Sequence, residues 1–326
     1  MKKWSLFLSI YFCLCLLTAC AAAPVETPAS SADAATPTSD TQPPPSDSVG
    51  PGRPYPSLAE DEEPTYIMCR IADGAEDGNL LLAEFPDDGE DPAASRNVYR
   101  LSLNGSAVPQ IKLDGEPVMP DALEDGMVVR IGFNGNVMET FPAQLGEVYT
   151  VSAYSIGTWE NPGGTCYDLC GLYLKVLDDL WKVDPGLNED IAIAGLDLSQ
   201  APGDLSESEK AAIAWRFGEM HGVEVVTGTF EELEAQGYFT ASAISTPAPE
   251  DGEDFSHMWN EWKDGCLFSI RPNADHEGEL YSLATIFFDA EKWRSPLGAY
   301  CFYDCSAMWP QAGTWGEYKI GSQMIS

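Results

Sequence analysis

The stretch MVVRIGFNGNVMETFPAQLGEVYTVSAY, residues 127–154, decides the fold expected for the first half of this chain. In residues 127–133 large apolar side chains alternate with other residues, which is the two-residue period of a strand with one buried face. Asn134-Gly135 follows, and this pair tolerates positive φ and predicts a type I′ hairpin turn. The next strand ends at Pro142, which has no N–H to donate to a sheet and indicates an edge or an exit. We interpret the stretch as a hairpin and one further strand.

The surrounding residues 65–155 have the same character of short apolar strands separated by turn residues. The predicted strands are Tyr66–Ile71, Asn79–Phe85, Asn97–Leu103, Val108–Leu113, Met127–Phe133, Val137–Phe141 and Val148–Tyr154. Many short strands with turns between them are typical of an all-β barrel or sandwich. We therefore predict a small β-barrel-like domain over this range.

Three segments of this region resemble a small OB-like β domain of unknown function found in Firmicute surface lipoproteins: LEDGMVV at residues 123–129, FNG at 133–135 and ETFPAQ at 139–144. The resemblance covers the β region alone and implies an OB-like barrel, a fold that binds oligosaccharide or nucleic acid across one sheet face. It implies no catalytic residues. Glu139 and Gln144 are candidates for ligand contact on such a face, and the alternative is that they hold a loop in place.

The N-terminus has the features of a secretory signal. Two lysines precede the apolar run Trp4–Leu17, which is too short to cross the roughly 30 Å of hydrocarbon in a bilayer. The run ends in LTAC, residues 17–20, which resembles a bacterial lipobox. We expect residues 1–19 to be removed and Cys20 to be lipidated, which anchors the protein to the extracytoplasmic face of the cell membrane. An ordinary signal peptide with a chance cysteine is the alternative.

Residues 20–64 are rich in Pro, Ser, Ala and Thr and contain almost no large apolar side chains. They include Pro43-Pro44-Pro45 and the acidic run Glu60–Glu63. Such a composition cannot offset the entropy lost on ordering, so a disordered tether is predicted. The tether would hold the folded part away from the lipid surface.

The acidic composition excludes one class of partner. The chain has 52 Asp and Glu against 17 Lys and Arg, a formal net charge of -35, and nucleic-acid affinity depends on Lys and Arg that neutralise phosphates. Acidic clusters at residues 87–91 and 184–190 suggest calcium, but an EF-hand loop counted from Asp184 has Glu189 and Gly195 where the pattern needs Gly and Glu. We expect solvated turns, no metal and no other cofactor.

Six cysteines remain after signal removal and lipidation. They are Cys69, Cys166, Cys170, Cys266, Cys301 and Cys305. On a strand, Cys301 and Cys305 would have Cα atoms about 13 Å apart, beyond the ~7 Å limit for a disulfide. The three histidines are scattered and none lies at a zinc-ligand spacing. We expect buried thiols that act as small hydrophobic groups, with one optional disulfide that involves Cys166 or Cys170.

From residue 165 onward the pattern changes to helices followed by strands. Asp168–Lys182 has apolar residues at helical spacing and predicts an amphipathic helix. Ser206–Glu209 and Thr229–Glu232 are capping boxes, whose side chains satisfy free N–H groups at the start of a helix, and each predicts a helix that ends near the next glycine. His221, at one helix end, is expected to interact with the last carbonyls rather than to serve as a base.

Strands dominate the rest of this region. A short apolar strand is predicted at Ile191–Leu196, and four antiparallel strands at Gly265–Arg271, Leu280–Asp289, Gly298–Ser306 and Trp315–Ile320. Helices before antiparallel strands indicate an α+β domain with an antiparallel sheet, residues 165–326, rather than alternating βαβ units. EKWRS at residues 291–295 and WGEYKIG at 315–321 resemble parts of uncharacterised clostridial lipoproteins, which implies no known function.

No catalytic motif is present: the sequence lacks G-x-S-x-G, H-E-x-x-H, G-x-G-x-x-G, a P-loop and C-x-x-C. Aromatic side chains are frequent toward the C-terminus, where Trp293, Tyr303 and Trp315 are candidates for a ligand face. Filling of the core is the alternative for these rings.

Two functions remain open at this point. The first is a non-enzymatic surface lipoprotein that binds an extracellular ligand, such as a glycan, or an envelope protein. The second is a glycan-active hydrolase that uses an Asp/Glu pair in the C-terminal domain, for example Asp289 with Asp304 or Glu317.

Overall fold

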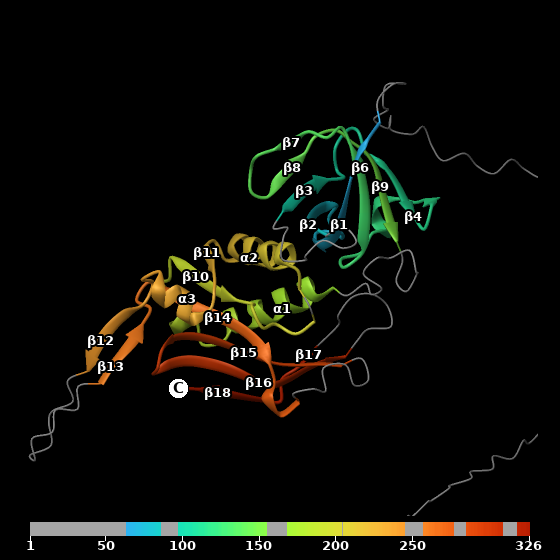
Figure 1. The fold of residues 1–326 in the computed structure, drawn as a ribbon. Coiled ribbons are helices and arrows are strands. Elements are labelled where there is room, and N and C mark those ends of the chain that lie inside the picture. The colour runs from blue at the N-terminus through green and yellow to red at the C-terminus, as the bar shows by residue number, and fades with distance from the viewer. Residues whose placement is uncertain are drawn as a thin grey trace, which may run out of the picture. The chain divides into compact units, whose positions relative to one another are not determined.

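Two large β-sheets organise the part of the chain that the structure describes (Figure 1). This computed structural model describes residues 63–85, 97–154, 168–203, 205–244, 257–276, 285–308 and 318–326. The predicted signal peptide, Cys20 and nearly all of the predicted tether lie outside the described residues. The described part is mainly β, as predicted, and residues 51–326 belong to one compact unit.

The first sheet has nine strands. They are β1 (Thr65–Asp73), β2 (Asn79–Glu84), β3 (Val98–Ser102), β4 (Gln110–Leu113), β5 (Glu116–Pro117), β6 (Val128–Phe133), β7 (Val137–Met138), β8 (Ala143–Leu145) and β9 (Val148–Tyr154). Their spatial order is β5-β4-β9-β6-β1-β2-β3-β8-β7. The order ends in two different strands, so the sheet is open and a closed OB-like barrel is not confirmed.

The predicted hairpin at Asn134-Gly135 is wrong. Of the two residues only Gly135 has positive φ, +79°, whereas a type I′ turn needs it at both. β6 pairs with β1 and β9, while β7 pairs with β8. The Asn134 N–H donates instead to the carbonyl of Glu147, and its Oδ1 accepts from the N–H of Asn136. The apolar β6 gains more by pairing with two buried strands than with the two exposed residues of β7.

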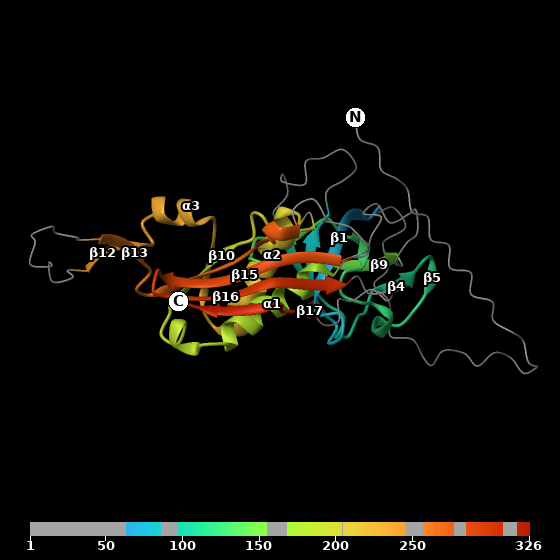
Figure 2. The ribbon, with the colours of Figure 1, turned by 90° about the horizontal axis from the view of Figure 1, so that it is seen from below.

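The second sheet is mixed. Its strands are β10 (Ile193–Asp197), β11 (Glu224–Thr227), β14 (Gly265–Pro272), β15 (Thr285–Ser295), β16 (Gly298–Met308), β17 (Tyr318–Lys319) and β18 (Ser322–Ile325). The order is β11-β10-β14-β15-β16-β17, with β18 also on β16. Figure 2 shows β10, β15, β16 and β17 of this sheet in the view from below. The predicted antiparallel sheet holds for β14 to β18, but β10 is parallel to both β11 and β14. β12 (Thr240–Ile244) and β13 (His257–Glu261) pair antiparallel in a separate two-stranded sheet.

Three helices belong to the described part: α1 (Leu169–Lys182), α2 (Glu207–His221) and α3 (Phe230–Ala235). Both predicted capping boxes are confirmed, with the Ser206 and Thr229 hydroxyls accepting the N–H groups of Glu209 and Glu232. α2 ends at Gly222, whose φ is +67°. The described β10–α2–β11 segment is therefore a βαβ unit, contrary to the prediction, which had no strand at the four residues of β11.

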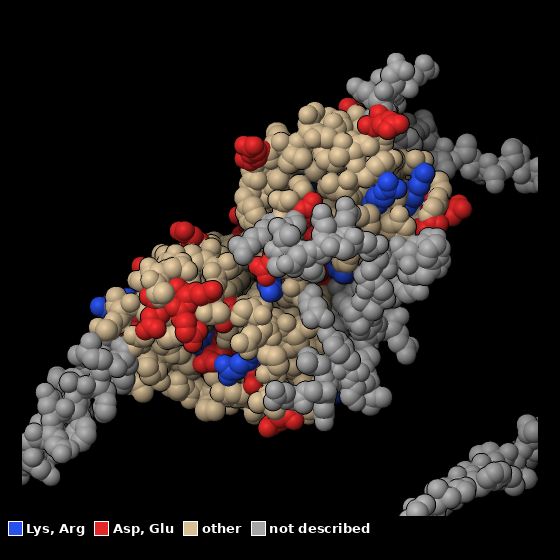
Figure 3. All heavy atoms as spheres, in the orientation of Figure 1, with Lys and Arg blue, Asp and Glu red and all other residues tan. Residues whose placement is uncertain are grey.

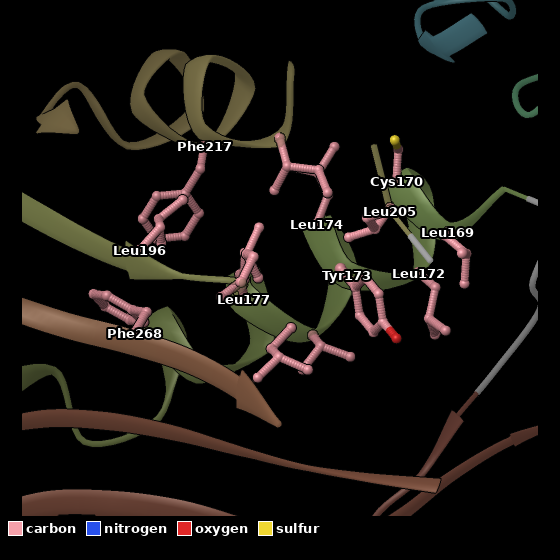
Figure 4. Packing of buried hydrophobic residues seen from close by; sticks show 14 of the residues in the cluster. Leu169, Cys170, Leu172, Tyr173, Leu174, Leu177, Leu196, Leu205, Phe217 and Phe268 are labelled. Carbon is pink, nitrogen blue, oxygen red and sulfur yellow. The ribbon is translucent and has the colours of Figure 1, made fainter. Parts of the chain in front are cut away.

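α1 and α2 pack in a core to which both sheets contribute. Figure 4 shows the part of this core where α1 and α2 meet Leu196 and Phe268 of the second sheet. The first sheet supplies Ala72, Leu81, Ala83 and Val98, and the second supplies Leu196, Phe268, Phe288 and Phe302 among others. Eight of the 14 residues of α1 are buried, and each large apolar side chain contributes about 1.5–3 kcal/mol on burial. The other face of the first sheet has its own core, which includes Ile71, Leu82, Val129 and Ile131.

A buried ion pair joins the first sheet to α2. Arg70 on β1 places Nε 2.8 Å from Oε1 of Glu209, and both side chains are less than one-tenth exposed. The other Glu209 oxygen accepts the N–H of Ser206 at 2.8 Å, and Arg70 donates to the carbonyl of Gly126 at 3.0 Å. Two turns further along α2, Nε of Arg216 lies 2.7 Å from Oδ2 of Asp73. These contacts fix both the height and the rotation of α2 against β1.

Acidic groups gather beside this contact. Asp168 caps α1 by accepting the N–H of Gly171 at 2.7 Å and is 6 % exposed. The pKa of Asp168 is raised to about 7, mainly by burial and also by the nearby carboxylates of Asp125 and Asp73, while the Gly171 hydrogen bond and Arg70 act in the opposite direction. Burial also raises the pKa of Asp125 and Asp73. Ionisation of this cluster therefore costs folding free energy.

The EKWRS segment, residues 291–295, serves the fold. The fully buried Lys292 donates from Nζ to the carbonyls of Val183 and Asp184 and to Oδ1 of Asn188, just beyond the end of α1. Burial lowers the pKa of Lys292 to about 8. Arg294 donates to the carbonyls of Leu187, Trp262 and Lys263 in the neighbouring loops. The two cations thus hold loop carbonyls that lie near the second sheet.

Five cysteines in the described part are buried and unpaired: Cys69, Cys170, Cys266, Cys301 and Cys305. Burial raises the pKa of each thiol. They are uncharged at neutral pH and pack as small hydrophobic groups, in agreement with the expectation from the sequence. Cys166, the other candidate for a disulfide, lies outside the described residues.

We predict that Arg70→Met lowers the free energy of unfolding by about 3–5 kcal/mol, because it leaves the buried Glu209 carboxylate without its cation. Arg70→Met combined with Glu209→Gln should recover part of the loss, since Gln keeps the capping box and carries no charge. Urea denaturation measures both. Arg100→Met, which removes an exposed cation over the Trp215 ring, is the control and should cost about 1 kcal/mol or less. Equal losses for Arg70→Met and Arg100→Met would contradict the structural role of the ion pair.

We predict that Asp168→Asn removes part of the pH dependence of stability. A folded-state pKa above the usual value means that stability is fully present below about pH 4 and is lost as the pH rises toward 7. Asn still caps the helix and carries no charge, so the variant should exceed the parent by at least ~1 kcal/mol at pH 8 and match it near pH 4. Thermal unfolding across this range measures the effect, with the exposed Asp121→Asn as the control. An unchanged pH slope in Asp168→Asn would refute the assignment.

Candidate functional site

A groove of about 1050 Å³ follows α2 and opens at the carboxyl ends of β10 and β11. β10 leads into α2, which packs on one face of the sheet, whereas β11 leads into α3, whose buried Leu233 packs on the other face with Trp262 and Leu267. Connections that leave neighbouring parallel strands toward opposite faces open a crevice at that edge of the sheet, where open α/β sheets bind ligands. The groove is therefore our candidate functional site.

The charges that line the groove are predominantly negative. Asp197, Glu207, Glu219 and Glu232 line it together with Lys210. The Lys210 Nζ lies 2.9 Å from Oε1 of Glu207, so this cation is already paired within the protein. Figure 3 shows further acidic side chains gathered over α3, whose sequence is FEELEA and whose N-terminal end borders the groove. The arrangement favours a ligand that carries positive charge or many hydrogen-bond donors.

Local turn chemistry positions the polar groups at the mouth of the groove. Asp197, the last residue of β10, accepts both the N–H and the hydroxyl of Ser199 on Oδ1, at 3.0 and 2.6 Å. Glu232 accepts the N–H of Thr229 at 2.9 Å in the capping box of α3. These bonds form within the loops themselves, so the carboxylates are held in place before any ligand arrives.

One wall of the groove is apolar. Ala211 and Trp215 on α2 line it, and the guanidinium of Arg100 on β3 lies 5.2 Å from the centre of the Trp215 ring. Phe141, from the loop between β7 and β8, also lines the groove and is 62 % exposed. Its loop is closed by a hydrogen bond from the Thr140 hydroxyl to the carbonyl of Pro142 at 2.8 Å. An aromatic ring held open to solvent at a groove is suited to ligand contact.

Glu139, in this loop, and Gln144, on β8, are both exposed. Neither side chain makes a hydrogen bond within the described residues, so the alternative expectation that they pin the loop gains no support. Neither lines the groove, whereas Phe141 between them does. The sequence signal that could have identified Phe141 is an aromatic residue directly before a proline in a polar loop.

Trp293 lies away from the groove, in a cluster of aromatic rings beneath α3. Its ring makes edge contacts with Phe230 and Phe239, with centroids 5.0 and 5.3 Å apart. The neighbouring Trp262 is fully buried and lies so close to Gly265 that a Cβ there would be 2.1 Å from the indole. These two tryptophans contribute to packing, which was the alternative expected for them.

Tyr303 lies on β16 beside Cys301. A hydrogen bond with Cys301 raises the pKa of the Tyr303 phenol to about 12, with burial as a further cause. The side chain is half-buried and distant in topology from β11, at the other end of the sheet. Tyr303 does not line the groove. Trp315, the other candidate of this region, lies outside the described residues.

The carboxylates proposed for a hydrolase are partly brought together. Asp289 accepts on one oxygen, Oδ1, both the amide of Asn273 at 2.7 Å and the backbone N–H of Asp304 at 3.0 Å. Asp304 is exposed, and its Oδ1 lies 3.3 Å from Nε2 of His276. Asp289 is 8 % exposed, and its contacts lie at the register shift between β15 and β16. Glu317 lies outside the described residues.

The expected contact between His221 and the last carbonyls of α2 is not found among the described residues, where its Nε2 has no hydrogen-bond partner. Its ring stacks on Trp181 with centroids 4.2 Å apart, and burial lowers its pKa. Nε2 lies 3.7 Å from Oδ1 of Asp178. The ring is therefore a packed, uncharged part of the core at neutral pH.

Among the described residues no group of three or more His, Cys, Asp or Glu side chains is placed to hold a metal ion. No helix in the described part is long and apolar enough to cross a bilayer. The sequence hypotheses missed the groove because Ser199, Lys210 and Glu232 have purely local signals, a turn, an i,i+3 pair and a helix cap. Comparison with protein-family models, with curated proteins and with solved structures finds no match to this chain.

Proposed function

We propose that this chain is a lipid-anchored, extracytoplasmic binding protein whose ligand lies in the groove between α2 and the carboxyl ends of β10 and β11. The groove, with its preset carboxylates and exposed Phe141, is the observation that carries the proposal. The apolar N-terminal run and the LTAC segment at residues 17–20 support the anchor. The resulting activity is ligand binding at the membrane surface, without turnover.

Binding is favoured over hydrolysis by the use that the chain makes of its carboxylates. A glycosidase needs two carboxyl groups that face a common substrate, one as acid and one as base or nucleophile. Asp289 is buried, and one of its oxygens accepts two hydrogen bonds within the protein. In the groove, Glu207 is paired with Lys210 and Glu232 caps α3. These carboxylates serve positioning, which suits a binding site.

The relationship to Firmicute surface lipoproteins and the OB-like character of residues 65–155 belong to the same proposal. The segments LEDGMVV, FNG and ETFPAQ support it, together with a sheet that has a core on one face. In this arrangement the ETFPAQ segment contributes Phe141 to the groove.

We predict that Cys20→Ala abolishes anchoring, because the thiol that receives the diacylglycerol is absent. The variant should appear in the soluble fraction or accumulate as an unprocessed precursor, whereas Cys69→Ala, which alters a buried cysteine, should fractionate as the parent does. Membrane fractionation with detergent partition measures this. A processed Cys20→Ala protein that remains with the membrane would refute the anchor.

We predict that Ala211→Trp abolishes ligand binding because the new indole fills the groove. Ala235→Trp, on the exposed face of α3 and outside the groove, is the matched control and should bind normally. The measurement is a screen of glycan and peptide arrays, with a parallel assay for hydrolysis. Ligands that bind both variants equally would refute the groove, and turnover lost in Asp289→Asn or Asp304→Asn would refute a binding-only protein.

A further inference from the structure

The groove runs along a strand that lies at the end of its sheet. Val223, Val225 and Thr227 line it, and they follow β11 from its start to its last residue. Within the described residues β11 pairs with β10 alone and is the terminal strand of the second sheet. A terminal strand presents backbone N–H and C=O groups that a further strand can pair with.

The direction of these groups follows from the pairing of β11 with β10. The N–H groups of Glu224 and Gly228 donate to the carbonyls of Ala192 and Leu196. Backbone groups alternate in direction along a strand, so Val225 and Thr227 point their N–H and C=O groups away from β10. They point toward the open side, where the groove lies.

We propose that the ligand of the groove is an extended, lysine- or arginine-rich peptide that adds to β11 as a further strand. This inference rests on the proposed function and names its ligand class. Strand addition gives affinity through main-chain hydrogen bonds and specificity through alternate side chains. The four residues of β11 offer partners to a peptide of about four or five residues, at ~3.3 Å per residue.

Charge complementarity selects a basic peptide. Asp197, Glu219 and Glu232 line the groove without a basic partner among its lining residues, because Lys210 is paired with Glu207. The exposed Glu224 lies on β11 itself. Alternate side chains of the added strand point to opposite faces of the sheet, as Val225 and Val226 of β11 do toward α2 and α3. The basic set would face Glu224 and Glu232 on the α3 side, and the apolar set would contact Trp215 on α2.

The probe is a seven-residue peptide that alternates valine and lysine and is blocked at both ends, titrated onto the full chain in detergent and followed by fluorescence anisotropy. We expect saturable binding that weakens with added salt, and at least tenfold weaker binding of the matched peptide that alternates valine and glutamate. Two N-methylated forms, one on every lysine amide and one on every valine amide, test the main-chain bonds. One form should bind as the parent peptide does and the other should lose binding, because only one edge of the peptide faces β11. Equal binding of both forms would overturn the inference.

Two variants test the same point from the protein side. Thr227→Pro removes one outward N–H and is compatible with a strand whose N–H faces solvent, so it should weaken peptide binding at least tenfold. Thr227→Ala keeps the N–H and should change the affinity less than twofold. If Thr227→Pro does not fold, as judged by its thermal midpoint, the pair of methylated peptides decides the question alone.

The outcome also separates this inference from the proposed function. If array ligands are lost in Ala211→Trp but the lysine peptide does not bind, the groove stands and strand addition is overturned. If the peptide binds equally to the parent and to Ala211→Trp, it lies elsewhere, and the inference is again overturned.

Discussion

The buried ion pair between Arg70 and Glu209 is the constraint on which the remaining structure depends. The desolvation cost of a buried charge is offset only when an opposite charge lies beside it. Arg70 on β1 and Glu209, the third residue of α2, must therefore meet at one place. Arg216 and Asp73 repeat the contact two turns later. With two points fixed, α2 cannot rotate about its axis. Its remaining side, with Ala211, Trp215 and Gly218, is thereby directed to the groove.

Local signals predicted most elements but not how they pair. The capping boxes at Ser206 and Thr229 and the alternation of residues 127–133 each describe one turn or one strand, and all three are present. The predicted hairpin at Asn134-Gly135 is wrong, and the predicted antiparallel pairing of the second sheet does not extend to β10 and β11, because strand partners depend on distant segments. β11 illustrates this: its four residues gain strand character only when α2 has brought them beside β10.

The candidate site was harder to predict than the fold for the same reason. The groove combines Phe141, the end of β10, one side of α2 and the start of α3, and these are far apart in the sequence. Each polar residue has a local role, such as the Asp197 turn or the Glu232 cap, that accounts for its presence without a ligand. Conversely, residue type alone makes Trp293 a ligand candidate, and only the packing of Phe230 and Phe239 around its ring shows that it belongs to the core.

The distribution of the few cations explains why the groove stays acidic. The chain has 17 Lys and Arg against 52 Asp and Glu, and the structure uses Arg70, Arg216, Lys292 and Arg294 to hold α2 and the loop carbonyls near the second sheet. These cations are already engaged in ion pairs and hydrogen bonds within the protein. The field in the groove therefore comes from its own carboxylates and from the acidic surface of α3, and it acts on an approaching ligand before contact. A basic ligand is attracted, because its positive charges pair with groove carboxylates that have no Lys or Arg of the groove lining beside them.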